Sequence, residues 1–227
     1  MAFAEFGSRV QEVRDRIDAA RARGGHGQTV RLIAVTKTHG ADAVDAAAAC
    51  GIGDVGENKV QEALDKMQAT TASVRWHLIG QLQRNKAKAA PNFSMVHSLD
   101  SVRLADALQQ AAAQAERTLD VLVQVNVAGE AQKGGVAPAE VQALAAHLTM
   151  TSSLRVAGVM CLAPFTDDES ILRPVFEGAR AALATVRAAG HGTAHELSMG
   201  MSGDYEIAVE EGATLVRLGT VLFGARS

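Results

Sequence analysis

Short apolar runs recur along the chain and alternate with longer stretches whose apolar residues are spaced as on one face of a helix. The runs cover residues 30–37, 52–58, 75–80, 94–100, 119–127, 154–163, 195–200 and 214–224. Most of them are continuously apolar rather than strictly alternating, which is typical of parallel strands that are covered on both faces. The pattern therefore predicts eight strands of one parallel sheet.

The stretches between these runs are rich in Ala, Gln and Glu and predict helices, as in "NKVQEALDKMQ", "DSVRLADALQQAAAQAE" and "APAEVQALAAHL". A further helix is expected before the first run, because Val10, Val13 and Ile17 recur at helical spacing. We expect Ser8 to cap this leading helix, Asp100 to cap a later one, and the glycine pair at 24–25 to end the first.

Eight strands with helices between them, preceded by one extra helix, predict the α/β class and a single (β/α)₈ TIM barrel. We expect one domain over residues 1–227, with the leading helix in 1–25 and the barrel in 29–224. The competing fold is a doubly wound open sheet. That fold requires a glycine-rich phosphate loop after its first strand, and "VTKTHG" at that place is not one.

Composition and charge exclude several classes of partner. Hydrophobic residues make up 48% and charged residues 21% of the chain, as in an ordinary globular protein, and the net charge of −3 provides no basic surface for nucleic acid. The first residues are too charged for a signal peptide, and no apolar run is long enough to cross a membrane, so a cytoplasmic location is expected. Cys50 and Cys161 lack metal-ligand spacing, which predicts two reduced thiols and no metal site.

In a barrel of this kind the active site lies at the carboxyl ends of the strands. The stretches "LSMGMSGD" and "VRLGTVLFG" provide small residues and hydroxyls after strands seven and eight, where these barrels often bind phosphate. The candidate residues at the strand ends are Lys37, Glu57, Asn58, His77, Gly80, Asn126, Ser198, Met199, Gly200, Arg217, Gly219 and Thr220.

Lys37 and Arg217 are the two candidates with the most distinctive chemistry. Partial burial at the end of strand one disfavours an ammonium ion, and the free amine of Lys37 can then form a Schiff base. Together with a phosphate site this fits a phosphorylated aldehyde, either pyridoxal 5′-phosphate (PLP) or a sugar phosphate. An arginine facing a pyridine nitrogen keeps that nitrogen neutral. The residues alone leave two alternatives open: a solvated Lys37, and an Arg217 paired with Glu57 or Glu196.

Several sequence blocks are together specific to one family. They include "LIAVTKT", "GENKVQEALDK", "WHLIGQLQRNK", "VHSLDS", "VLVQVNVAGEAQKGG", "GVMCLAP" and "LSMGMSGDYEIAVEEGATLVRLGTVLFGAR", and they extend over nearly the whole chain. In these blocks the chain resembles the pyridoxal-phosphate homeostasis protein family. That family shares the PLP-binding barrel of the amino-terminal domain of alanine racemase, the fold-type III barrel.

The resemblance implies a role for each matched residue. Lys37 would hold PLP as a Schiff base, Arg217 would face the pyridine nitrogen and Asn58 would lie close to the cofactor. His77 would line the ring and Ser202 would assist at a helix start. The residues that would bind the phosphate are Ser198, Gly219 and Thr220. The chain departs from the family at Gly134, where many relatives have serine, and this affects a local contact of Lys133.

The resemblance also implies a protein of vitamin B6 homeostasis that buffers PLP or delivers it to apo-enzymes without robust catalysis, as a monomer or weak homodimer. The alternative is a small PLP-dependent amino-acid racemase. Racemases of the barrel family use a second base, a tyrosine from an added β-domain. This chain has one tyrosine, Tyr205, on the expected helix after strand seven, and it has no length for that domain. We therefore expect a carrier.

Overall fold

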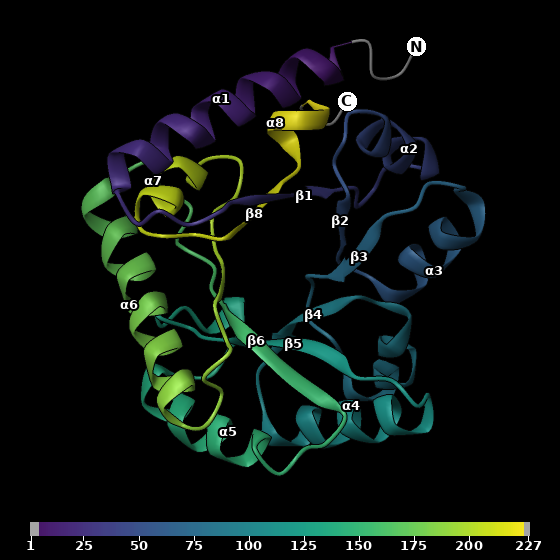
Figure 1. The fold of residues 1–227 in the computed structure, drawn as a ribbon, viewed down its shortest axis with the longest axis vertical. Coiled ribbons are helices and arrows are strands. Elements are labelled where there is room, and N and C mark those ends of the chain that lie inside the picture. The colour runs from purple at the N-terminus through teal and green to yellow at the C-terminus, as the bar shows by residue number, and fades with distance from the viewer. Residues whose placement is uncertain (1–4, 225–227) are drawn as a thin grey trace.

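A closed barrel of eight parallel strands forms the centre of the protein (Figure 1). The computed structural model describes residues 5–224. Each strand pairs with its neighbour in chain order, and the first strand closes the barrel by pairing in parallel with the eighth, with Ile33 opposite Arg217. Helices surround the barrel, so the predicted (β/α)₈ architecture is confirmed.

The predicted runs contain all eight strands. The strands are β1 (Arg31–Val35), β2 (Asp54–Glu57), β3 (Arg75–Leu78), β4 (Met95–Leu99), β5 (Leu119–Gln124), β6 (Leu154–Met160), β7 (Glu196–Ser198) and β8 (Leu215–Leu218). The α-helices are α1 (Phe6–Gly24), α2 (Ala41–Ala49), α3 (Val60–Ala69), α4 (Val102–Gln114), α5 (Val141–Leu148), α6 (Glu169–Ala188), α7 (Tyr205–Glu210) and α8 (Thr220–Phe223). The 3₁₀ segments are η1 (Arg84–Asn92), η2 (Ala131–Lys133) and η3 (Pro138–Glu140).

The structure corrects the predicted ends of several elements. The last run was expected to be strand to residue 224, but it divides into β8 and α8 because strand pairing ends at Leu218 and Gly219 caps the short helix. Ser8 does not cap α1, since that helix begins at Phe6 and the Ser8 hydroxyl donates to the carbonyl of Glu5. Asp100 does not cap α4. The N-cap is Ser101, whose hydroxyl accepts from the N–H of Leu104.

The leading helix α1 lies across the outside of the barrel beside α7 and α8 (Figure 1). Its apolar face is buried as the spacing predicted, and Gly25 ends the helix in a left-handed conformation with φ 69°. Arg16 and Arg23 form ion pairs with Glu206 and Glu210 of α7. No helix among residues 5–224 is both long enough and apolar enough to span a bilayer.

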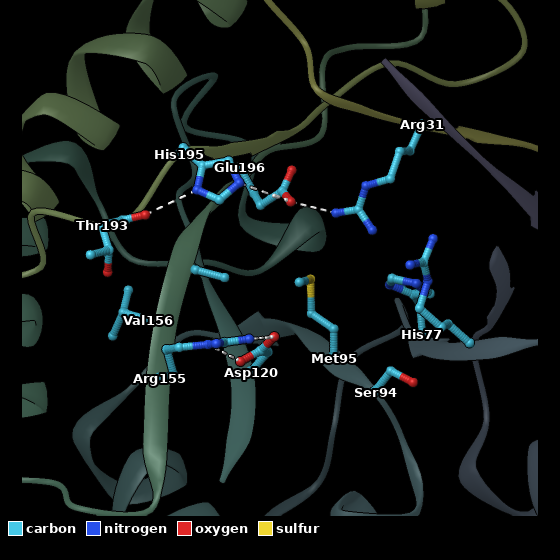
Figure 2. A pocket seen from close by; sticks show the side chains of 12 residues that line it. Arg31, His77, Ser94, Met95, Asp120, Arg155, Val156, Thr193, His195 and Glu196 are labelled. Carbon is cyan, nitrogen blue, oxygen red and sulfur yellow. Dashed lines mark hydrogen bonds and ion pairs between the residues drawn. The ribbon is translucent and has the colours of Figure 1, made fainter. Parts of the chain in front are cut away.

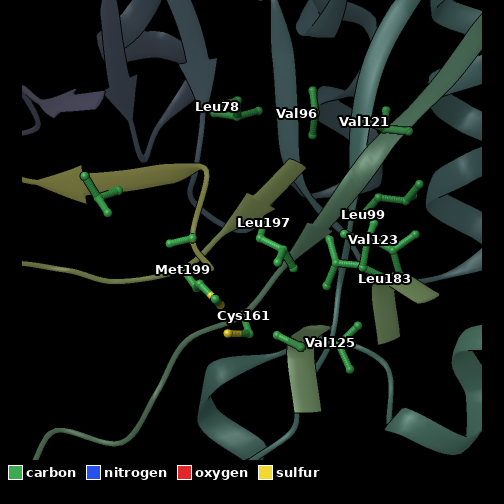
Figure 3. Close-up of a cluster of buried hydrophobic side chains, with 14 of the residues drawn as sticks. Leu78, Val96, Leu99, Val121, Val123, Val125, Cys161, Leu183, Leu197 and Met199 are labelled. Atoms are coloured by element: carbon green, nitrogen blue, oxygen red, sulfur yellow. The ribbon is translucent and has the colours of Figure 1, made fainter. Parts of the chain in front are cut away.

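Alternate residues of each strand face two different cores. The larger core lies between the strands and the surrounding helices, and Figure 3 shows part of it, including Leu78, Val96 and Leu197. The smaller core lies inside the barrel and consists of Ile33, Met95, Leu122, Met160 and Leu215. These five side chains fill only part of the interior, and several of the remaining inward positions are polar, among them His77, His97 and Arg217.

The barrel interior is too crowded for some additional atoms. A Cβ added at Gly158 of β6 would lie 1.9 Å from the carbonyl oxygen of Glu196 on β7, which is backbone that cannot move aside. We expect Gly158→Ala to lower the free energy of unfolding by about 2–3 kcal/mol or more, as measured by urea denaturation. Gly53→Ala, which adds a Cβ with no atom within 4 Å, is the control. Equal stability of the two variants would contradict this account of the packing.

Candidate functional site

A cavity of about 1010 Å³ opens at the carboxyl ends of the strands. Of the six predicted site residues, the structure brings five together in its lining: Lys37, Asn58, Arg217, Gly219 and Thr220. They come from the ends of β1, β2 and β8 and from the start of α8. The carboxyl-end rule therefore places these side chains around one space, although they are up to 183 residues apart in the chain (220 − 37).

A buried lysine fixes the backbone on the amino side of Lys37. Lys66, on α3, is buried, and its Nζ donates to the carbonyl of Thr36 at 2.7 Å and to Glu57 Oε1 at 2.6 Å. The Thr36 hydroxyl donates to the same carboxylate oxygen at 2.5 Å. Burial raises the pKa of Glu57 although both donors oppose the shift. The end of β1 is thus bound to β2 and α3 behind the cavity.

The backbone on the carboxyl side of Lys37 is held as well. The N–H of Thr38 donates to Glu62 Oε1 at 2.6 Å, and Glu62 in turn accepts from Lys66 at 2.9 Å. Thr38 has φ 68°, a left-handed conformation that costs free energy for a β-branched residue. A hydrogen bond on each side therefore fixes the point from which the Lys37 side chain enters the cavity.

Lys37 and Lys66 have opposite surroundings. Lys66 forms ion pairs with two carboxylates and a hydrogen bond to a carbonyl. Lys37 is half-buried and lines the cavity, and within residues 5–224 no carboxylate forms an ion pair with it. An amine without a carboxylate partner is available to react with a carbonyl carbon.

Arg217 lines the cavity, although only 4% of its surface is exposed. Its Nη1 donates to the Ser198 hydroxyl at 2.6 Å and its Nη2 to the carbonyl of Cys161 at 2.9 Å. Burial lowers its pKa, yet a guanidinium remains charged at neutral pH. The salt bridges considered from the sequence are not formed, because Glu57 pairs with Lys66 and Glu196 pairs with Arg31.

Ser198 and His77 do not occupy the places expected from the sequence. The Ser198 side chain is fully buried inside the barrel, where it contacts Arg217 and His97, and it does not line the cavity. The His77 side chain lies inside the barrel toward its amino end, and it does not line this cavity. β3 continues past His77, and the residues that reach the cavity there are Ile79 and Gly80.

The turn after β7 explains why later residues replace Ser198. Gly200 has φ 93°, and a Cβ there would lie 2.8 Å from the Cβ of Ala208 on α7, so only glycine allows this turn to pack against α7. The chain then turns toward the cavity, where Met201, Ser202 and Asp204 line it. Ser202 was expected at the start of the helix after β7, but Asp204 is the N-cap of α7, and the Ser202 hydroxyl instead accepts from the N–H of Val221 in α8 at 3.3 Å.

Several lining residues were not singled out from the sequence: Gln81, Gln124, Met160, Leu162, Phe165, Met201 and Asp204. Gln124 and Met160 are the last residues of β5 and β6, so the carboxyl-end rule would have found them if the strand ends had been known. Burial raises the pKa of Asp204, which accepts a hydrogen bond from the N–H of Met201. The predicted contact residue Lys133 also lines the cavity, with its Nζ bound to the carbonyl of Ala163 at 2.5 Å.

A second cavity of about 420 Å³ opens at the amino ends of the strands (Figure 2). Its charged side chains are paired: Arg31 with Glu196, Arg75 with Asp54, and Arg155 with Asp120. Because these charges cancel, the cavity has no excess charge to attract an ionic substrate. Conserved geometry at this end of such barrels serves stability rather than catalysis. Within the described residues no group of His, Cys, Asp and Glu side chains could hold a metal ion.

The donor set of the larger cavity suits a phosphorylated aromatic aldehyde. Lys37 provides an amine for the aldehyde, Arg217 a cation, and Ser202 and Thr220 hydroxyl donors beside Gly219. Apolar side chains provide walls for a flat ring: Val35, Ile79, Met160 and Leu162. The volume exceeds what one such molecule needs, so the cavity leaves room for a second small reactant.

Comparison with known proteins points to the same chemistry. The family model for the alanine racemase N-terminal domain matches residues 9–227. A pyridoxal phosphate homeostasis protein of Aquifex aeolicus is 38% identical over 96% of this chain and 97% of its own length, and one of Pseudomonas aeruginosa is 43% identical over 92% and 90%. The structure of PipY from Synechococcus elongatus with PLP bound superposes with a TM-score of 0.85 at 34% identity, covering 96% of this chain and all of PipY.

The ion pair behind β1 allows a direct test of this description of the site. Lys66→Met leaves Glu57 buried without its cation, and we expect it to lower the free energy of unfolding by about 3–5 kcal/mol. Glu57→Gln combined with Lys66→Met removes both charges and should recover most of that loss. Lys59→Met, the same substitution at an exposed lysine, should change the free energy by less than about 0.5 kcal/mol. Chemical denaturation of the three variants measures these values, and a double variant no more stable than Lys66→Met alone would contradict the coupling.

Proposed function

Because the chain belongs to the pyridoxal phosphate homeostasis proteins, within the alanine racemase N-terminal domain family, we propose that it binds PLP and acts in vitamin B6 homeostasis. The observation that carries the proposal is that Lys37, unpaired with any carboxylate among the described residues, and the charged Arg217 line one cavity. A covalent anchor and a cation therefore face the same ligand.

Each residue has one task in this proposal. Lys37 is the amine that bonds to the aldehyde carbon. The hydrogen bonds of Lys66 to the Thr36 carbonyl and of the Thr38 N–H to Glu62 fix its position. Thr220, Ser202 and Gly219 bind the phosphate group. Asn58, which also lines the cavity, lies beside the ring. Ser198 acts on Arg217 rather than on the phosphate, because its hydroxyl is buried in that contact.

Arg217 favours storage of the cofactor over its use. When bound, PLP supplies an electron sink whose strength depends on protonation of its ring nitrogen. A guanidinium has only donors and cannot transfer a proton to that nitrogen at neutral pH, so it keeps the ring neutral and the sink weak. The five donors of Arg217 are already partly used by Ser198 and Cys161, which holds the guanidinium in one orientation.

The position of Tyr205 argues against the racemase alternative. Its side chain is 2% exposed and packs under Arg16 of α1, and it does not line the cavity. Burial raises the pKa of its hydroxyl, which has no hydrogen-bond partner within residues 5–224. A second base on the far face of the cofactor is therefore not provided by the only tyrosine of the chain.

We accordingly propose a carrier that works in the cytoplasm, keeps free PLP low and releases it to PLP-dependent apo-enzymes. The cavity is open enough for a free amino acid to reach the carbon bonded to Lys37, which gives a route for release by exchange of one amine for another. This exchange is reversible and requires no second base.

Reduction with borohydride tests the anchor. Purified protein incubated with PLP should absorb visible light, and reduction should fix the cofactor to Lys37, as identified by peptide mapping. Lys37→Ala should abolish the visible absorbance. Lys133→Ala, which removes another lysine of the same cavity whose Nζ is already bound to a carbonyl, should retain it. An adduct on Lys59 or Lys86 in the wild-type protein would contradict the assignment.

Assays of racemisation test the carrier against the enzyme. With alanine, serine and other amino acids, the loaded protein should produce no racemisation above that of free PLP. Tyr205→Phe should leave PLP binding unchanged and should raise the free energy of unfolding by up to about 1 kcal/mol, because it removes a buried hydroxyl without a partner. A substantial rate that disappears in Tyr205→Phe would establish the racemase instead.

A further inference from the structure

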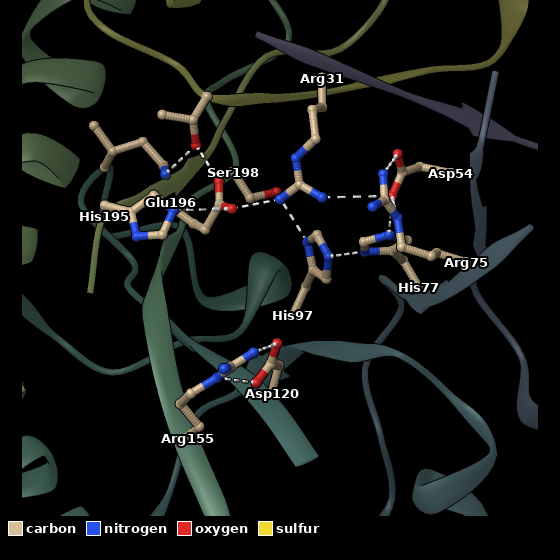
Figure 4. Close-up of polar contacts among 12 residues, drawn as sticks. Arg31, Asp54, Arg75, His77, His97, Asp120, Arg155, His195, Glu196 and Ser198 are labelled. Carbon is tan, nitrogen blue, oxygen red and sulfur yellow. Dashed lines mark hydrogen bonds and ion pairs between the residues drawn. The ribbon is translucent and has the colours of Figure 1, made fainter. Parts of the chain in front are cut away.

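A continuous chain of polar side chains runs through the barrel interior, and Figure 4 shows most of it. Ser198 Oγ lies 2.9 Å from His97 Nδ1, and His97 Nε2 lies 2.9 Å from His77 Nδ1. His77 Nε2 lies 2.8 Å from Asp54 Oδ1. With the contact between Arg217 and Ser198 at 2.6 Å, four hydrogen bonds connect the floor of the PLP cavity to the cavity at the opposite end of the barrel.

The two ends of this chain determine its direction. Arg217 has only donors, and Asp54 is an acceptor because hydrogen bonds from His77 and Arg75 outweigh burial and hold its pKa well below the usual range. His77 must therefore carry its proton on Nε2. If both rings are neutral, His77 Nδ1 accepts from His97 Nε2–H, and His97 Nδ1 accepts from the Ser198 hydroxyl. The oxygen of Ser198 then remains free to accept from Arg217, so every donor points toward Asp54.

The surroundings favour a neutral His97. This ring is completely buried, and burial, together with the guanidinium groups of Arg217 and Arg31, lowers its pKa well below the usual value. A proton on His77 Nδ1 would reverse the direction of the chain. Ser198 would then accept from both His97 and Arg217, and its hydroxyl proton would have no acceptor in the chain. The added proton would also make His77 a cation beside the guanidinium groups of Arg31 and Arg75.

We propose that Ser198, His97, His77 and Asp54 form a polarised hydrogen-bond relay that positions Arg217 against the ring nitrogen of PLP. The inference rests on the proposed function in one respect, that PLP occupies the cavity above Arg217. The four are positioning residues, because they act through Arg217 and do not touch the cofactor. Each member is fixed by the next, and the chain ends on Asp54, which Arg75 binds through both oxygens at 2.8 and 2.6 Å.

The relay also explains why polar groups occupy the middle of the barrel. His77 and His97 are 1% and 0% exposed, and their rings meet edge to face with centroids 5.1 Å apart. Buried imidazoles without partners would cost free energy that the small inner core of five apolar side chains cannot offset. Arranged in this order, every nitrogen of both rings has a hydrogen-bond partner. The aligned hydrogen bonds form a fixed dipole whose negative end faces Arg217.

Nitrogen-15 NMR of the ligand-free protein tests the relay without PLP. The chain has seven histidines, and long-range proton–nitrogen spectra distinguish which ring nitrogen of each is protonated. We expect His77 and His97 to be in the Nε2–H tautomer, and His97 to remain neutral from pH 5 to pH 9. An Nδ1–H tautomer of either ring, or an imidazolium signal from His97 within this range, would overturn the proposed direction.

Serine variants test the effect on the cofactor. Ser198→Ala removes the acceptor of Arg217 Nη1, and we expect PLP to bind about tenfold more weakly with a shifted visible absorption maximum. Ser98→Ala is the matched control, because Ser98 is also fully buried on a barrel strand but its hydroxyl has no partner within the described residues. Ser98→Ala should change neither the affinity for PLP nor the visible absorption maximum. Ser198→Thr keeps a hydroxyl and should restore the wild-type spectrum.

The outcomes separate failure of the relay from failure of the proposed function. If wild-type protein does not bind PLP, the proposed function fails while the NMR result still decides the relay. If wild-type protein binds PLP and Ser198→Ala matches Ser98→Ala in affinity and spectrum, the positioning role is wrong. Should Ser198→Ala unfold, His97→Gln, which keeps one donor and one acceptor, gives the same readouts, and an unchanged spectrum there would also reject the role.

Discussion

Closure of the parallel barrel is the constraint on which the rest of the structure depends. Once β1 pairs with β8, the interior is enclosed by strands, and a polar side chain that points inward finds its partners among other inward side chains. Ile33 and four other apolar residues fill part of this space, and the polar positions form one connected network rather than isolated groups. Closure also leaves the carboxyl ends of the strands as the place where inward side chains can meet a ligand.

The two lysines near the site lie on opposite faces of the end of β1. Thr36 faces outward, where Lys66 and Glu57 bind it, and the next residue, Lys37, faces inward toward the cavity. A buried ion pair of this kind contributes little net stability, but loss of one partner is costly, so it fixes a geometry. That geometry includes the left-handed Thr38, whose strain is offset by its hydrogen bond to Glu62.

The sequence was sufficient for the fold and for bringing five of the six predicted site residues to one cavity, and the reasons are physical. Strand periodicity and the carboxyl-end rule need only the approximate end of a strand, and they brought Lys37, Asn58 and Arg217 to one place. Ser198 and His77 were misplaced because the depth of an inward side chain depends on where the strand stops: both point into the barrel but lie below the cavity. β7 is only three residues long, and the turn at Gly200 moves the lining to later positions. Hydrogen bonds inside the barrel join residues of five strands, from β2 to β8, and have no local sequence signal.

The fixed position of Arg217 bears both on how a cofactor would be held and on what chemistry it could support. A guanidinium whose donors are bound by Ser198 and the Cys161 carbonyl cannot move to follow a change of charge in a bound ring. Racemisation on PLP requires a base on each face of the substrate carbon, and the electron sink is stronger when the ring nitrogen is protonated. Here the nitrogen would face a fixed cation and Tyr205 is packed away under α1. Under the proposed function, the fixed guanidinium that would orient the ring of the cofactor would also keep it a weak electron sink.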